Sequence, residues 1–241
     1  METKNPFYLF AGGRGHSMHS TIAGVQRILK ENGTVIPGVA FIGAASFRDH
    51  WIPFAIIAAF IKIGCKCRVH RVLIAAPDAD LKKARSLIQQ ADVVFFSGGD
   101  MEAGMDVLRQ KNMVEFFREM AQQDKLFIGV SAGSIMMAQA WVSWPKPDGE
   151  SSPRLNDCLA LVPFLCDTHA EKDDWFELKT ALQLREDGSV GYGISSGAYL
   201  MVSRDGRLQA KAGEVACFTN QGGKIERKAD LSPDDFFTKK V

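Results

Sequence analysis

The sequence lacks several features that would point to particular classes of protein. It has no apolar run of about 18 residues, so no membrane-spanning helix is expected. Its 29 basic and 28 acidic residues nearly cancel, which argues against binding to nucleic acid or to an anionic membrane surface. Repeats, low-complexity segments and a signal-peptide pattern are also missing. The 241 residues therefore predict one globular domain spanning residues 1–241.

Cysteine is scarce and irregularly spaced, which bears on compartment and on metal binding. The chain has five cysteines, and Cys65 and Cys67 have no second pair that would complete a zinc site. An odd number of cysteines without a disulfide framework indicates reduced thiols. We therefore expect a cytoplasmic protein that uses no metal ion and no organic cofactor.

Strand and helix patterns alternate through the first 141 residues, which predicts an α/β fold. Short apolar runs, each followed by small residues or by a turn, mark the expected strands at residues 7–10, 35–46, 68–76, 92–97 and 126–130. Such alternation is typical of a mostly parallel sheet with helices on both faces. Sites in these sheets lie at the carboxyl ends of the strands. The strand-end loops at 12–16, 44–49, 98–101 and 131–133, which are rich in Gly, Ala and Ser, are therefore expected to meet in one crevice.

The remaining segments carry other patterns. An apolar segment at 51–63 predicts a buried helix, and the polar, proline-containing segment 144–156 predicts a long surface loop. The apolar run 158–166 is expected to resume the sheet. Asp205-Gly206 and Gly222-Gly223 separate short strands and predict hairpins, hence an antiparallel C-terminal extension of the parallel sheet.

The segment from Lys125 to Trp141 carries the strongest chemical signal. A buried strand leads into Gly129-Val130-Ser131-Ala132-Gly133, and a helix is expected from Ser134 to Trp141. Small residues on both sides of a serine between strand and helix are typical of a nucleophile elbow, which lifts the hydroxyl clear of the sheet. The alternative is a glycine-rich strand-to-helix loop without a catalytic role, and the flanking strand and helix favour the elbow.

A serine nucleophile needs a base, and His169 is the best candidate among the five histidines. It is the histidine that follows the elbow, and it also follows an apolar strand. His70 lies within a strand, and His50 precedes a helix, so structural roles are expected there. His16 and His19 follow the first strand and are weaker candidates.

The base needs an acid that orients it, and the oxyanion needs two N–H donors. Glu171 and Asp167 each lie two residues from His169, and an extended segment would point His169 and Glu171 the same way. The sequence leaves open which acid, if either, serves. Ala132 follows the nucleophile and supplies one N–H by position, and Gly99 is the best second donor.

These motifs, taken together, resemble one known family. An α/β-hydrolase would place its histidine near the C-terminus, and this chain has no histidine after His169. Ser131 in GVSAGS, Gly98-Gly99-Asp100 and Asp167-Thr168-His169, each at the end of an apolar strand, instead resemble the dipeptidase E and cyanophycinase family of serine peptidases. That family has a class I glutamine amidotransferase-like fold, a flavodoxin-like three-layer sandwich with a nucleophile elbow. The resemblance covers the chain from its first strand to the hairpins.

The resemblance implies hydrolysis of an amide bond in a short peptide or isopeptide. Ser131 would be the nucleophile, His169 the base, Glu171 its partner, and the N–H groups of Gly99 and Ala132 the oxyanion hole. Members of the family favour acidic residues, and a homodimer would fit the family's habit.

The chain departs from the cyanophycinase pattern at three places. Met101 replaces a glutamine that follows Gly-Gly-Asp, and residues 170–173 lack the arginines that follow the histidine. Ser195-Ser196 replaces an acid in the late strand pair. Cyanophycin is therefore not the expected substrate. Asp100, Arg14 and Arg48 are the candidates for substrate binding, and the arginines could bind a carboxylate.

Two other functions stay open at this point. The protein could bind an amino-acid-like ligand or a protein partner with weak or no catalysis, because the expected acid is displaced. An amidotransferase-like domain is the other alternative, although it would need a cysteine at the position of Ser131.

Overall fold

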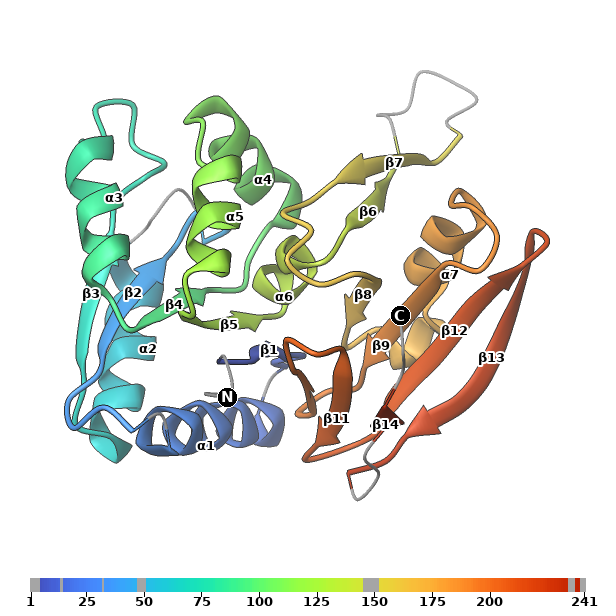
Figure 1. Cartoon of the computed structure of the whole chain (residues 1–241), viewed down its shortest axis with the longest axis horizontal. Coiled ribbons are helices and arrows are strands. Elements are labelled where there is room, and N and C mark those ends of the chain that lie inside the picture. The colour runs from blue at the N-terminus through green and yellow to red at the C-terminus, as the bar shows by residue number, and fades with distance from the viewer. Residues whose placement is uncertain are drawn as a thin grey trace.

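A computed structural model describes residues 5–13, 15–31, 33–46, 51–144, 152–233 and 237–238 of the chain. Helices and strands alternate along its first half, as Figure 1 shows. The strands up to the nucleophile segment are β1 (Phe7–Phe10), β2 (Gly38–Ile42), β3 (Arg68–Val72), β4 (Val93–Phe96) and β5 (Leu126–Val130). The helices are α1 (His16–Glu31), α2 (Trp51–Gly64), α3 (Leu81–Gln90), α4 (Met101–Gln110), α5 (Val114–Gln122) and α6 (Ala132–Met137).

The second half is mostly strands. They are β6 (Ala140–Ser143), β7 (Arg154–Asp157), β8 (Leu165–Thr168), β9 (Val190–Ile194), β10 (Tyr199–Val202), β11 (Arg207–Lys211), β12 (Val215–Gln221), β13 (Lys224–Leu231) and β14 (Phe237–Thr238). Between β8 and β9 lie a 3-10 helix (Glu171–Asp173) and α7 (Phe176–Gln183).

The central sheet has eight strands in the order β14-β11-β10-β1-β5-β4-β2-β3. β1, β5, β4, β2 and β3 are parallel to one another, and β10, β11 and β14 extend the sheet antiparallel. This confirms the predicted mostly parallel α/β fold with antiparallel C-terminal strands. The predicted hairpins at Asp205-Gly206 and Gly222-Gly223 join β10 to β11 and β12 to β13.

Helices cover both faces of the central sheet, in line with the fully buried residues of β2, β4 and most of β5. α1 and α2 pack on one face through residues such as Val25, Leu29 and Ile61. α3, α4, α5 and α6 pack on the other face, where Phe96, Phe117 and Phe127 form part of a larger core. Among the described residues, no helix is both long and apolar enough to cross a membrane.

The run that was expected to resume the central sheet instead starts a second one. β8 pairs with β9 in a four-stranded sheet of order β13-β12-β9-β8. α7 packs against this second sheet, and both lie beside the central sheet in Figure 1. Strand patterns give no information on which sheet a strand joins, so the sequence could not separate the two.

Three local expectations were also wrong. α6 ends at Met137, and the residues expected to complete it form β6, which pairs with β7. β7 itself lies within the expected surface loop, of which residues 145–151 fall outside the described residues. α2 exposes apolar side chains on its outer face, including Ile56 and Ile63, whereas a buried helix was expected.

The packing of α6 against β4 depends on a glycine. A Cβ atom at Gly133 would lie 2.3 Å from the backbone oxygen of Phe96, and backbone cannot move aside as a flexible side chain can. We expect Gly133→Ala to lower the free energy of unfolding by about 1–3 kcal/mol, the usual cost of overpacking. Urea denaturation measures this change.

Gly38→Ala is the matched control, because its Cβ would meet ordinary contacts of 3.6 Å or more. It should change the free energy of unfolding by less than about 1 kcal/mol. Equal effects of the two substitutions would contradict the packing argument.

Candidate active site

Ser131 lies at the sharp turn between β5 and α6. Its backbone has φ +53° and ψ −121°, an unfavourable combination for a residue with a side chain. Two backbone hydrogen bonds hold the turn: Ser131 N–H donates to Phe10 O at 2.9 Å, and Ser134 N–H donates to Ser131 O at 2.8 Å. A serine on a strained strand-to-helix turn has the geometry of a nucleophile elbow.

Glycines from two neighbouring strand ends make room for this serine. A Cβ atom at Gly98 would lie 3.1 Å from the Cβ atom of Ser131, and one at Gly12 would lie 3.6 Å from it. Gly12 also has φ +75°, which favours glycine. The glycine-rich strand ends therefore fit closely around Ser131, as their convergence in one crevice requires.

His169 reaches Ser131 from the second sheet. It directly follows β8, and its N–H donates to Ile194 O of the neighbouring β9 at 2.9 Å. Its backbone has φ +47°, so the chain leaves the strand direction at this residue. The Nε2 atom of His169 lies 2.8 Å from Oγ of Ser131, within hydrogen-bond distance. This is the contact that a general base makes with a serine nucleophile.

Glu171 lies near His169 but is not bonded to its ring. Residues 171–173 form a 3-10 helix rather than the extended segment assumed from the sequence. Ser196 N–H donates to Oε1 of Glu171 at 3.4 Å. Burial raises the pKa of Glu171, but hydrogen bonding from Ser196 and the nearby His169 outweigh this and lower it overall. Among the described residues, no carboxylate bonds to Nδ1 of His169 in this structure.

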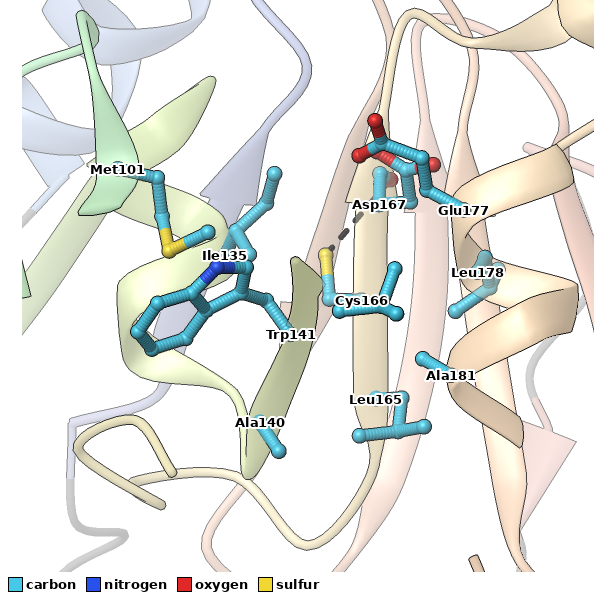
Figure 2. A pocket seen from close by; sticks show the side chains of 11 residues that line it. Met101, Ile135, Ala140, Trp141, Leu165, Cys166, Asp167, Glu177, Leu178 and Ala181 are labelled. Atoms are coloured by element: carbon cyan, nitrogen blue, oxygen red, sulfur yellow. Dashed lines mark hydrogen bonds between the residues drawn. The ribbon is translucent and has the colours of Figure 1, made fainter. Parts of the chain in front are cut away.

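Asp167 lines a different cavity from the one that Ser131 and His169 line. Figure 2 shows its carboxyl group beside that of Glu177, in a small cavity of about 30 Å³ that α7 helps to line. Oδ1 accepts the Thr168 N–H at 2.7 Å, and the buried Oδ2 has no partner among the described residues. Burial, together with the charges of Glu177 and Asp173, raises the pKa of Asp167 to about 7. Of the two candidate acids, Glu171 is therefore the one on the side of His169.

Gly99 and Ala132, the expected oxyanion donors, flank Ser131 differently. Gly99 lines the same cavity as Ser131. Its φ is +144°, and a Cβ atom at this position would lie 1.9 Å from Ala45 O, so only glycine fits here. Ala132 is the first residue of α6, and the first N–H groups of a helix have no acceptor within the helix.

Of the three candidates for substrate binding, only Asp100 lies among the described residues. Asp100 is the N-cap of α4: its Oδ1 accepts the Ala103 N–H at 3.0 Å, and it is not among the residues that line the cavity. Its expected role in substrate binding is therefore not supported by its position. Arg14 and Arg48 lie outside the described residues.

Ser131 and His169 line one cavity of about 690 Å³. It includes residues that sequence reasoning had not assigned to the site, namely Lys172, which follows Glu171, and apolar residues of α1 and α2. Ser196, which replaces the acid that the family resemblance implies, also lines the cavity. Position after a strand end was the available signal for Lys172 and Ser196, whereas nothing in the sequence set the helix residues apart from core residues.

The cysteines lie away from this chemistry. Cys166 is buried beside Asp167, where burial raises its thiol pKa well above the ordinary value. A neutral, buried thiol is a poor nucleophile. Serine is therefore the nucleophile that the geometry offers.

In a mostly parallel α/β fold, a serine on a strained elbow with a hydrogen bond to a histidine defines a site of the serine-hydrolase class. The model of peptidase family S51 matches residues 8–209, and the chain belongs to that family. It is thus a serine-type peptidase. No curated protein matches the chain closely enough to count as a relative.

Solved structures agree with the fold. A peptidase from an acI-B1 Actinobacterium superposes with a TM-score of 0.71 at 18% identity, covering 98% of this chain and 97% of that one. A putative peptidase E protein from Listeria monocytogenes EGD-e superposes with a TM-score of 0.61 at 15% identity, covering 86% of this chain and 98% of that one.

The raised pKa of Asp167 predicts a pH-dependent stability. Between the unfolded pKa near 4 and the folded pKa of about 7, the folded state holds a proton that the unfolded chain releases. This group therefore makes stability fall as the pH rises through that window, by up to about 1.4 kcal/mol per pH unit. Asp167→Asn should remove this slope and be more stable than the parent at pH 8.

Urea denaturation of parent and variant at pH 4.5, 6 and 8 measures the difference. Asp78→Asn, at an exposed aspartate, is the control and should leave the slope unchanged. A parent and an Asp167→Asn variant with parallel pH profiles would show that Asp167 is ionised in the folded protein.

Proposed function

We propose that the protein hydrolyses an amide bond in a short peptide or isopeptide, with Ser131 as nucleophile and His169 as base. The observation that carries this proposal is the 2.8 Å contact between Oγ of Ser131 and Nε2 of His169, at a serine held on a strained turn. The contact joins residues from two different sheets, so it is not a by-product of local chain geometry.

In the first half of the reaction, His169 Nε2 accepts the proton of the Ser131 hydroxyl while Oγ attacks the carbonyl carbon. The resulting oxyanion accepts hydrogen bonds from the N–H groups of Gly99 and Ala132. The protonated His169 then donates its proton to the leaving amine as the C–N bond breaks. In the second half, His169 activates a water molecule that hydrolyses the ester on Ser131 and frees the serine.

Glu171 acts in this scheme as a positioning residue. Ser196 holds its carboxylate near His169, where negative charge stabilises the imidazolium that forms during both halves of the reaction. Substrate carboxylates could pair with Lys172 at the same edge of the cavity. Arg14 and Arg48 stay candidates for that role on sequence grounds alone.

The proposal predicts that a fluorophosphonate probe labels the parent once, at Ser131. Ser131→Ala should give no adduct, and His169→Ala should label at least about a hundredfold more slowly, because a serine without its base is a weak nucleophile. Intact-mass analysis over time measures both. His16→Ala, at an exposed histidine outside the cavity lining, should label at the parental rate.

A folded parent that takes up no probe would contradict an activated serine. It would favour the second candidate, a protein that binds an amino-acid-like ligand without turnover. The observation behind that candidate is the lack of a bond between His169 Nδ1 and a carboxylate among the described residues.

The positioning role predicts a separation of kinetic constants. Glu171→Gln keeps the shape of the side chain and removes its charge, so kcat should fall about tenfold or more with little change in KM. Glu171→Asp should recover part of the loss. Unchanged kcat in Glu171→Gln would show that Ser131 and His169 act as a dyad.

A further inference from the structure

The residues that line the cavity at Ser131 fall into a charged group and an apolar group. The charged group lies at the end of β8 and comprises His169, Glu171 and Lys172. The apolar part of the lining, which we name the apolar wall, consists of Met18, Ile22, Val25, Ile57, Ile61 and Phe95. These residues come from α1, α2 and β4, and none of them can carry a charge.

The apolar wall is too open to be a packing defect. Folded interiors contain few voids larger than a water molecule, whereas this cavity measures about 690 Å³ and falls in the range of small-molecule pockets. Val25, Ile61 and Phe95 are buried in the core between the sheet and the two helices. Core packing therefore holds these three side chains of the apolar wall in place. Met18 stays 42% exposed at its rim.

The charged residues of α1 and α2 do not line the cavity. Arg27, Lys30 and Glu31 on α1 and Lys62 on α2 are not among its lining residues. An acidic side chain placed against the wall would lose hydration and, among the described residues there, find no cation to replace it. An aliphatic or aromatic side chain would lose water from its own surface and from the wall.

We propose that the apolar wall is a specificity pocket for an apolar side chain next to the scissile bond, so that the preferred substrates are short peptides containing leucine, methionine or phenylalanine. The proposal rests on Ser131 being the reactive group, because that residue and the wall line the same cavity. The acidic specificity that the family resemblance implies would require cations on the wall instead.

The substrate test uses four dipeptides: leucyl-leucine, leucyl-aspartate, aspartyl-leucine and aspartyl-aspartate. We expect kcat/KM for leucyl-leucine to exceed that for aspartyl-aspartate by roughly tenfold or more, the scale on which apolar pockets discriminate. The two mixed dipeptides then show which side of the scissile bond the wall serves. Preference for aspartate at both positions would overturn the proposal and turn attention to Arg14 and Arg48.

Adjacent isoleucines on α2 provide a matched pair of variants. Ile57 is half-buried and lines the cavity, whereas Ile56 is 52% exposed and does not. Ile57→Trp should fill the pocket and lower kcat/KM for leucyl-leucine about tenfold, mainly by raising KM, and Ile56→Trp should leave it unchanged. Ile22→Trp repeats the test from α1 in case Ile57→Trp is unstable. Equal kinetics for the cavity-lining and control variants, all folded, would overturn the proposal.

A binding measurement separates this inference from the proposed reaction. Thermal unfolding of Ser131→Ala with each dipeptide at millimolar concentration needs no turnover. Leucyl-leucine should raise Tm and aspartyl-aspartate should not, whereas the reverse order, or no shift with any dipeptide, contradicts the apolar pocket. Absence of Ser131-dependent hydrolysis together with a leucyl-leucine shift would reject the reaction and keep the pocket.

Discussion

Close backbone packing around Ser131 is the constraint on which the site depends. The serine adopts φ +53°, and glycines near it in the sequence and in space allow backbone segments to approach one another closely. A Cβ atom would lie 2.7 Å from Gly133 O at Gly129, 2.3 Å from Phe96 O at Gly133 and 3.1 Å from the Cβ atom of Ser131 at Gly98. The strain at the nucleophile is thus maintained by strands whose backbones are already fixed in the central sheet.

The second constraint is the alignment of two sheets, because each supplies one residue of the contact between Ser131 and His169. Ser131 follows a strand of the central sheet, and His169 follows a strand of the second. The turn between β9 and β10 crosses from one sheet to the other and is tied down where Gly197 N–H donates to Gly12 O and Ala11 N–H donates to Ala198 O. The same turn presents Ser196 to Glu171, so it positions both the loop beside the nucleophile and the acid near the base.

Sequence patterns predicted what depends on local periodicity and failed where distant segments decide. The strand and turn at Ser131, the start of the helix after it and the two hairpins have local signals, and the structure contains them. The face of the second sheet to which Asp167 points depends on how β8 pairs with β9. The turn at His169 interrupts the extended chain, so the prediction that His169 and Glu171 point the same way lost its basis. α2 is apolar apart from Lys62 in its last turn, so its sequence could not show which face packs on the sheet and which stays exposed.

In the proposed mechanism, Glu171 supplies the negative charge near His169 from a segment other than the one that the family resemblance implies. The family resemblance places an acid in the turn after β9, where this chain has Ser195 and Ser196. A serine N–H in that turn is a donor, and it holds a carboxylate that arrives from the 3-10 helix after β8. The imidazolium formed during catalysis responds to the electric field at its ring and not to the segment that generates the field. The Ser196 N–H, which stands where the family resemblance implies an acid, therefore complements the carboxylate of Glu171.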